Sequence, residues 1–368
     1  MSAPLNTNAD FDYLVTFLPA GWQQKAKELG ALKRCRKIPD AATLLRILLL
    51  HLAEGCSLRE TAARLTRGGI AKVSDVTIMD RLRGAGSWLR WMSVELMQTW
   101  IAKPPDAVFG TRRRLRLVDG TRIKEPGPTG SSWCIHYSIE LPTLRCCDVI
   151  VQDKHGCGET FKKFDIRPDD LMIGDRVYGS TPGISHVIDN GGDVLVRFAW
   201  NLLPLWHDEN NSFDLLGHLR SLRGRQLGDW DVLIKDGDQR HKGRVCALKK
   251  SRQATEAAKK KIRRAAQKQG SETQPETLET AGYVMVFTSL DRKELGPAAA
   301  LNMYRGRWQI ELVFKRLKSL LGLGHLKKTD ATSTEAWLHG KLLVAFLLEA
   351  LLCKGEAFSP WGYVIPQE

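Results

Sequence analysis

The sequence predicts an α/β protein with an N-terminal helical domain, a mixed sheet covered by helices, and a β-rich insertion. Apolar residues recur with helical spacing over residues 1–105, strand-like runs dominate residues 106–200, and helical spacing returns over residues 291–352. Residues 201–290 again favour strands and form the predicted insertion, and residues 353–368 form a tail. A chain of 368 residues is too long for one ordinary core, which also indicates several domains.

The composition indicates a polyanionic partner. A net charge of +14 favours phosphate binding, as on DNA. The eight cysteines show no Cys-x-x-Cys spacing, which disfavours a structural zinc site, and scattered free cysteines fit a reducing cytoplasm. The N-terminus lacks a charged segment followed by an apolar one, and apolar runs such as Leu342–Leu348 are too short to span a bilayer. We therefore expect a cytoplasmic protein that does not act on a membrane.

The N-terminal helices include a possible DNA-reading unit. Ala41–Ala53 is a strongly apolar helix, and a Ser-Leu-Arg-Glu capping box opens a second helix, Leu58–Leu65. Gly68-Gly69 ends it, and a third helix follows. Two short helices around a glycine-containing connection resemble a helix-turn-helix, which would place Arg81 and Arg83 near DNA bases or phosphates. A helical bundle with solvated arginines explains the same pattern.

The predicted sheet begins as a meander of three strands and continues with alternating strand and helix. Five strand-like runs carry this prediction: Arg114–Val118, Trp133–Leu141, Leu144–Gln152, Leu171–Gly174 and Asp193–Trp200. Pro142 separates the second and third runs, and a helix is expected at Gly183–Asn190. A meander followed by alternating elements favours a mixed sheet covered by helices.

The insertion combines strands with a strongly basic segment. Strand-like runs occupy Asp229–Ile234, Gly243–Leu248 and Gly282–Leu290. Between them, Lys249–Gly270 carries nine Lys or Arg residues against one acid, and polar Ser271–Thr280 reads as a loop. We expect the basic segment to contact phosphates, although a solvated helix face is the alternative. The residues expected to make these contacts are Lys259, Lys260, Lys261, Arg263 and Arg264.

The segment from Tyr304 to Lys318 is the most informative part of the chain. Tyr304, Arg307, Glu311 and Lys318 are spaced by three, four and seven residues, which places them within an arc of roughly 60° on one helix face. An apolar stripe beside them would bury the helix against a core. One carboxylate among cations indicates a site for both metal and phosphate. In the simpler interpretation, the cations are solvated ion-pair partners of Glu311.

Two further acids could join Glu311 at a metal site. Asp119 follows the mostly apolar run of the first strand, and Asp175 ends a later strand. Adjacent strands lie about 4.8 Å apart, so both could share a metal with a glutamate from a packed helix. Carboxylate oxygens suit Mg²⁺ or Mn²⁺, and two ions roughly 4 Å apart would clamp an in-line phosphoryl displacement. We prefer Asp175 because it ends an apolar strand; the acids set aside are Asp148, Asp153, Asp165, Asp169 and Asp170.

These residues resemble the DDE transposases of bacterial insertion sequences, in the insertion-sequence-four family. The family signature is Tyr-x2-Arg-x3-Glu-x6-Lys, and the segment from Tyr304 to Lys318 matches it without a gap. Asp175-Arg-Val-Tyr178 resembles the Asp-Arg-Gly-Tyr context of the second catalytic aspartate, with Val177 in place of glycine. Leu-Val-Asp119-Gly-Thr resembles the context of the first. The resemblance covers roughly residues 110–350.

The resemblance implies a ribonuclease-H-like catalytic core with a β-rich insertion, and an enzyme that cuts the ends of its element and joins the 3′-hydroxyl to target DNA. It implies that Asp119, Asp175 and Glu311 hold two metal ions. The residues that would then contact DNA are Tyr304, Arg307, Lys318, Arg176 and Tyr178. Some relatives stack a flipped base on an aromatic of the insertion, for which Tyr283 is the candidate here.

The implied partners are the terminal inverted repeats of the element and the target DNA. We expect a homodimer assembled on DNA, although the short tail after Leu352 leaves no room for a large C-terminal dimerisation domain. The rival interpretations are a catalytically inactive DNA-binding regulator derived from a transposase and a stand-alone nuclease. The three intact acids disfavour the first, and the Tyr304–Lys318 face and long insertion disfavour the second.

Overall fold

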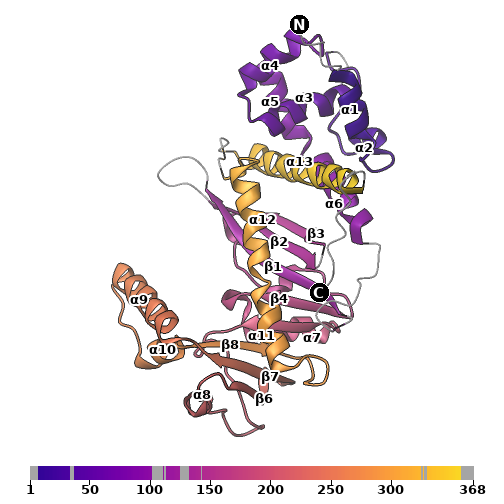
Figure 1. The fold of residues 1–368 in the computed structure, drawn as a ribbon. Coiled ribbons are helices and arrows are strands. Elements are labelled where there is room, and N and C mark those ends of the chain that lie inside the picture. Colours follow the sequence, from indigo (N-terminus) through magenta and orange to yellow (C-terminus); the bar gives the residue numbers. More distant parts are fainter. Residues whose placement is uncertain are drawn as a thin grey trace.

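The computed structural model describes residues 7–33, 37–101, 111, 113–124, 132–141, 143–324, 326 and 330–357. The N-terminal helices lie at one end of an elongated molecule, one large sheet forms its body, and the insertion lies at the other end (Figure 1). Pro142 and the tail beyond residue 357 lie outside the described residues.

In the described ranges, six helices precede the sheet, and side-chain caps start three of them. The carboxylate of Asp40 accepts from the amide of Thr43, the Ser57 hydroxyl accepts from Glu60, and the Ser74 hydroxyl accepts from Thr77. The helices are α1 (Thr7–Val15), α2 (Trp22–Glu28), α3 (Ala41–Glu54), α4 (Leu58–Arg67), α5 (Asp75–Gly84) and α6 (Gly86–Ile101). The three predicted helices are therefore confirmed.

The contacts of α6 differ from those of the helices before it. It packs along α13 (Ala331–Ala357) and against β3 (Arg145–Gln152) of the sheet. This packing favours a domain boundary ahead of α6 rather than at residue 105. The connection from α4 to α5 spans residues 68–74, which is longer than the three to four residues of a standard helix-turn-helix.

The first five strands follow the ribonuclease-H-like order β3-β2-β1-β4-β5. β2 runs antiparallel to both β1 and β3, whereas β1, β4 and β5 are parallel. The remaining elements of this part are β1 (Arg114–Lys124), β2 (Ser132–Leu141), β4 (Asp170–Gly174), α7 (Thr181–Asp189) and β5 (Asp193–Arg197), with 3₁₀ turns η1 (Lys154–Gly156), η2 (Phe161–Lys163) and η3 (Arg176–Tyr178). The mixed sheet predicted from the sequence is thus confirmed.

The insertion extends this sheet. β8 pairs antiparallel with β5, and β7 and β6 follow, which gives a single eight-stranded sheet. Its elements are α8 (Leu215–Ser221), β6 (Leu227–Asp236), β7 (Gln239–Lys249), α9 (Arg252–Gln269), α10 (Pro275–Thr280) and β8 (Tyr283–Thr288). The loop predicted at Ser271–Thr280 is wrong over α10, because proline in the first turn of a helix is favourable.

The predicted continuous helix around Glu311 consists of two helices, α11 (Pro297–Arg305) and α12 (Trp308–Ser319). At the junction, the amides of Gly306 and Arg307 bond to carbonyls three residues back, which tightens the turn. Gly306 explains the weak point, since glycine is a poor helix former. The single face predicted for the four signature residues is therefore divided between α11, the junction and α12.

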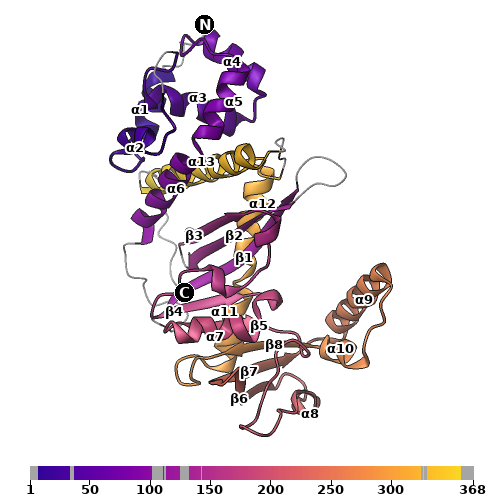
Figure 2. The same ribbon diagram turned by 180° about the vertical axis from the view of Figure 1, so that it is seen from behind.

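Helices cover both faces of the sheet. α11 and α12 cross one face, and α7 lies on the opposite face (Figures 1 and 2). One apolar core joins the first face to α6, α13 and the N-terminal helices, and a second core fills the space under α7 and the insertion.

Within the described ranges, one helix is long and apolar enough to cross a membrane by length and composition, the stretch Ala331–Lys354 of α13. In its most apolar stretch of 18 residues, 72% is buried inside the protein. The run Leu342–Leu348, predicted to be too short for a span, belongs to this longer helix. Its burial against α3, α5 and α6 accounts for its apolar composition.

The expectation that the cysteines are free is wrong for one pair. Cys134 on β2 and Cys157 after η1 form a disulfide, with their Cα atoms 5.3 Å apart. No local pattern predicts this pair, because the two cysteines are 23 positions apart and meet only when β3 and η1 fold back along β2.

Candidate active site

Asp119 and Asp175 lie side by side where β4 ends. β1 pairs in parallel with β4 up to Leu117 and Ile173. The two aspartates follow these paired residues by two positions each, so they lie next to each other. The predicted end of the first strand at Val118 is wrong, because pairing with β2 continues β1 to Lys124. β4 stops at Gly174, which opens the sheet beside Asp119.

Local hydrogen bonds orient both carboxylates. The amide of Gly120 donates to Asp119 Oδ1 at 2.8 Å, and the amide of Val177 donates to Asp175 Oδ1 at 2.9 Å. Asp175 thereby caps η3, which turns the chain away from the edge of the sheet.

Arg307 links the third acid to this pair. Its Nη1 lies 3.6 Å from Asp119 Oδ2, and its Nη2 donates to Glu311 Oε1. α12 packs against β1, which carries Glu311 to the same sheet edge. Arg307 and Asp119 are mostly buried, whereas the side chain of Glu311 is 56% exposed. The ion pair between Arg307 and Glu311 was the simpler interpretation of the sequence pattern, and it exists in this conformation.

Negative charge exceeds positive charge around Asp119. Burial raises the pKa of Asp119 to about 6, and the charges of Asp175 and Glu159 act in the same direction. The Gly120 amide and the Arg307 guanidinium oppose this rise. A divalent cation at this point would relieve the repulsion and keep the carboxylates ionised.

The acids suit a hard divalent ion in their chemistry, since carboxylate oxygens are the ligands preferred by Mg²⁺ and Mn²⁺. Among the described residues, no three His, Cys, Asp or Glu side chains are close enough to hold a metal ion. The guanidinium of Arg307 lies between Asp119 and Glu311. In this conformation the chemistry of Asp119 and Asp175 suits such an ion, and the Arg307 guanidinium separates Glu311 from Asp119.

A basic face adjoins the carboxylates. Lys318 Nζ donates to the backbone carbonyl of Arg122 on β1 at 3.4 Å. Burial raises the pKa of Tyr304, so its hydroxyl stays protonated beside Arg307 and can donate a hydrogen bond to a phosphate. Arg176, on η3, is exposed and lies beside Asp175.

Sequence reasoning missed Arg197, the last residue of β5. The parallel register pairs Gly174 with Val196, so Arg197 stands next to Asp175 at the same sheet edge. It lines a cavity of about 230 Å³ together with Tyr304 and Arg307. The rule that the carboxyl ends of parallel strands meet at one edge could have identified it.

Two of the three predicted aromatic DNA contacts, Tyr178 and Tyr283, are buried. Tyr178 has no exposed surface, and its ring packs 5.1 Å from that of Phe161. Tyr178 is therefore a core residue, and its assignment as a DNA contact is wrong for this conformation. Tyr283 is 8% exposed and lines a cavity of about 270 Å³ whose wall includes Arg176 and Arg197.

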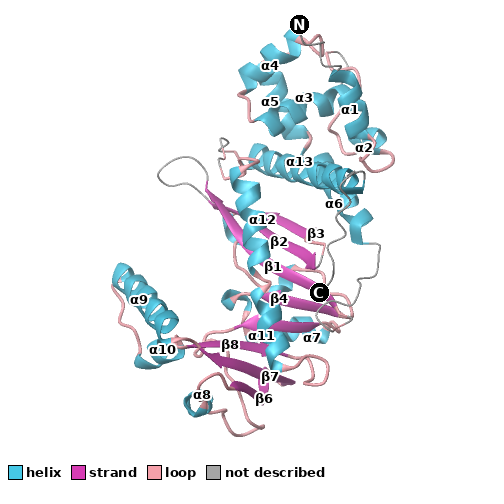
Figure 3. Cartoon of the chain, viewed as in Figure 1, coloured by secondary structure: helices cyan, strands magenta, loops and turns pink. Residues whose placement is uncertain are grey.

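The basic segment of the insertion forms α9, which stands away from the sheet (Figure 3). None of its residues is buried. Lys259 lies 3.4 Å from Glu256, the acid of this helix. The other four predicted contacts are exposed: Lys260, Lys261, Arg263 and Arg264.

The two predicted DNA contacts on α5, Arg81 and Arg83, lie in different surroundings. Arg83 donates to Ser333 Oγ at 2.9 Å and lies 3.3 Å from Asp330, which ties α5 to the start of α13. Arg81 is half-buried on the same helix.

Two of the acids that we set aside, Asp169 and Asp170, have structural partners. Asp170 is buried between Arg114 and Arg116, at 2.6 and 2.8 Å. Asp169 is exposed and lies 3.1 Å from Arg113. These pairs explain why strand-edge aspartates near Asp175 serve the fold rather than the site.

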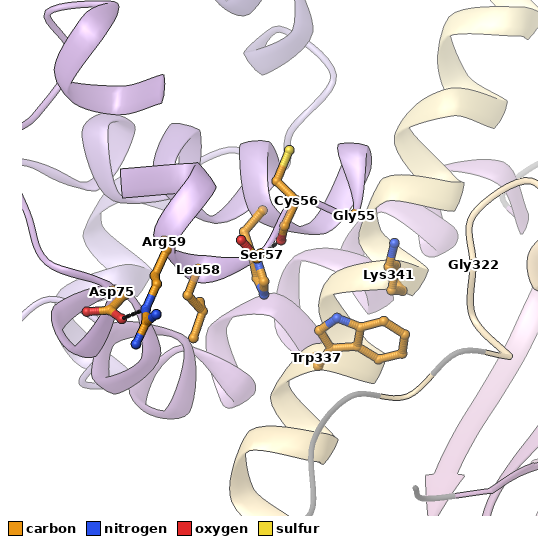
Figure 4. Close-up of a pocket in the computed structure, with 10 residues that line it drawn as sticks. Gly55, Cys56, Ser57, Leu58, Arg59, Asp75, Gly322, Trp337 and Lys341 are labelled. Atoms are coloured by element: carbon orange, nitrogen blue, oxygen red, sulfur yellow. Dashed lines mark hydrogen bonds and ion pairs between the residues drawn. The ribbon is translucent and has the colours of Figure 1, made fainter. Parts of the chain in front are cut away.

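A separate cavity of about 430 Å³ lies where the N-terminal helices meet α13 (Figure 4). Trp337 and Lys341 form one side, with the ammonium 5.3 Å from the indole centre. Arg59 and Asp75, 3.4 Å apart, form the other side. The three predicted catalytic acids do not line this cavity, so it is distinct from the carboxylate site.

The ribonuclease-H-like sheet, Asp119 beside Asp175, and the helix that carries Glu311 to the same edge are consistent with the class of DDE transposases. The family model of the transposase DDE domain matches residues 144–347, which include Asp175 and Glu311. The InsL protein of insertion sequence element IS186A from Escherichia coli is 34% identical over 348 residues, 93% of each chain. The transposase for insertion sequence element IS421 from Escherichia coli is 34% identical over 349 residues, with the same coverage.

The chain therefore belongs to the family of insertion-sequence DDE transposases. Enzymes of this family act on DNA with divalent metal ions.

Proposed function

We propose that this protein cleaves the ends of an insertion sequence and joins the freed 3′-hydroxyl to target DNA by two-metal phosphoryl transfer. The observation that carries the proposal is the pairing of Asp119 with Asp175 at the open sheet edge, with Glu311 connected to them through Arg307. The intact acids disfavour the alternative of an inactive regulator. The signature from Tyr304 to Lys318 supports membership of the insertion-sequence-four family.

Asp119, Asp175 and Glu311 would hold two Mg²⁺ or Mn²⁺ ions, which supply charge neutralisation and an activated attacking oxygen when bound. Water attacks the element end first, and the freed 3′-hydroxyl then attacks the target. Arg307 exchanges its carboxylate partners for a DNA phosphate, which releases Glu311. Charge-assisted hydrogen bonds from Arg176, Tyr304 and Lys318 hold the phosphates next to the reacting one.

The DNA duplex extends beyond the site along two further surfaces. The exposed residues of α9 bind phosphates without reading sequence, which fits a helix that buries none of its own residues. The N-terminal helices supply end recognition through α5. The Tyr283 cavity accepts a flipped base near the cleaved end. The protein acts in the cytoplasm as a homodimer assembled on the terminal inverted repeats.

The test is cleavage of a duplex that carries the terminal repeat of the element encoding this protein, with Mg²⁺, followed on a denaturing gel. We expect Asp175→Asn to retain DNA binding and to lose strand cleavage. Asp169→Asn is the matched control and should cleave normally, because Asp169 is exposed and pairs only with Arg113 among the described residues. Cleavage by Asp175→Asn would refute the assignment of this acid.

A further inference from the structure

A fourth acid, Glu159, lies at the carboxylate site. A Cβ atom built on Gly120 would stand 2.6 Å from Glu159 Oε1 and 2.9 Å from its Cδ, so the carboxylate rests against the backbone that follows Asp119. Only glycine at position 120 leaves space for the side chain in this place. Glu159 is thus in contact with the strand that carries Asp119, although 40 positions separate the two in sequence.

The residues on each side of Glu159 are anchored. Cys157 is held to β2 by the disulfide with Cys134, and Phe161 is completely buried against Tyr178. Two fixed points, each two residues away, restrict the backbone of Glu159. The connection between η1 and η2 therefore has little freedom to move this acid away from Gly120.

In the part of the chain that the structure describes, the carboxylate of Glu159 makes no hydrogen bond and no ion pair within 4 Å. The positive charge of Arg122 on β1 attracts this carboxylate from beyond ion-pair distance. Burial raises the pKa of Glu159, and the nearby charge of Asp175 raises it further. A half-buried acid beside two other acids is unfavourable until a cation binds among them.

We propose that Glu159 is a positioning residue of the metal site, which holds the hydrated Mg²⁺ or Mn²⁺ through hydrogen bonds from the water bound to it. Mg²⁺ in proteins keeps several of its waters, and these waters need acceptors. Asp119 and Asp175 would supply oxygens before DNA binds, Glu311 would join them when Arg307 engages a phosphate, and Glu159 rests against Gly120. The inference rests on the proposed function, because it assigns a role at the same site.

The test is a calorimetric titration of Mn²⁺ into the full chain without DNA. Outer ligands of metal sites typically contribute about 10- to 100-fold in affinity, so we expect Glu159→Gln to bind Mn²⁺ about 10-fold more weakly. Gly120→Ala should produce a similar loss, because its methyl group displaces the carboxylate. The matched control is Glu209→Gln, which removes one negative charge from an exposed loop and should bind as the wild type does.

A second measurement separates this role from a structural one. In EDTA, Glu159→Gln should melt at a higher temperature than the wild type, since the substitution removes repulsion. This gain in melting temperature should disappear when Mn²⁺ is present, because the bound ion relieves the same repulsion. A residue that only supports the fold would lower the melting temperature in both buffers, and that result would overturn the proposal.

The outcomes also distinguish this inference from the proposed function. If Asp119→Asn weakens Mn²⁺ binding and Glu159→Gln does not, the role of Glu159 is wrong and the metal site stands. If neither substitution changes Mn²⁺ binding, or the wild type binds no Mn²⁺, the site itself is misassigned and the inference fails with it.

Discussion

Replacing Asp119 with asparagine should stabilise the metal-free protein at neutral pH. Burial and neighbouring carboxylates raise the pKa of Asp119 from 3.8 to about 6. A shift of about two pKa units corresponds to about 3 kcal/mol of unfavourable free energy for the ionised form, at about 1.4 kcal/mol per unit. Asparagine keeps an oxygen that can accept from the Gly120 amide and removes the charge.

The pH dependence has a definite sign. Between pH 4 and 6 the folded protein holds a proton on Asp119 that the unfolded chain has lost, so stability falls as pH rises through this window. Above pH 6 the carboxyl is ionised in both states and the full penalty persists. The advantage of Asp119→Asn should therefore be complete above pH 6 and should vanish near pH 4.

Urea unfolding in EDTA at pH 8 and pH 4 measures this difference. Asp169→Asn is the control, because Asp169 is an exposed aspartate with a φ of 71°, a conformation that asparagine also adopts readily. Mn²⁺ should reverse the ranking, because it should stabilise the wild type and Asp169→Asn more than Asp119→Asn. Equal or lower stability of Asp119→Asn at pH 8 in EDTA would show that Asp119 is not an electrostatically strained acid.

Three other predictions concern DNA binding and the disulfide. Neutralising five of the seven basic residues of α9 should reduce the slope of log affinity against log salt by about 0.9 for each lost phosphate contact. The five residues are Lys259, Lys260, Lys261, Arg263 and Arg264. An unchanged slope would leave α9 as a solvated helix. Arg81→Ala should weaken the preference for terminal repeats over random DNA by about 1–3 kcal/mol in a competition gel shift, and a preserved preference would exclude a base contact. Cys134→Ser should lower the free energy of unfolding by about 3 kcal/mol under oxidising conditions and not in dithiothreitol, since the disulfide closes a loop of 23 positions. Cys353→Ser is its control, and equal losses in both buffers would mean that packing, not the disulfide, is responsible.

The structure changes how end recognition should be tested. A truncation at residue 105 would remove α6 from its contacts with α13 and β3, and would expose an apolar helix of the core. Arg83 is also unsuitable for a first substitution, because it pairs with Asp330 and Ser333. Substitution of Arg81 alone leaves these contacts in place.

Local signals in the sequence determined most of the elements. The capping box at Ser57 and the apolar spacing of α3 predict helices because caps and periodicity act within a few residues. The strands of the core were predicted for the same reason, with ends displaced by a few positions. The motif from Tyr304 to Lys318 identified the helix that carries Glu311, since its spacing is also local.

Tertiary structure decided which residues meet. Strand register placed Arg197 beside Asp175, and β2 extended β1 beyond Asp119. Packing buried Tyr178, whose sequence context indicated DNA contact. Glu159 and the Cys134–Cys157 pair depend on segments that are distant in sequence. The sequence by itself therefore determined the elements and three candidate acids, because these follow from hydrogen bonds and spacing within single segments. The fourth acid, the Arg307 bridge and the continuous eight-stranded sheet depend on pairing between segments, which only the folded chain fixes.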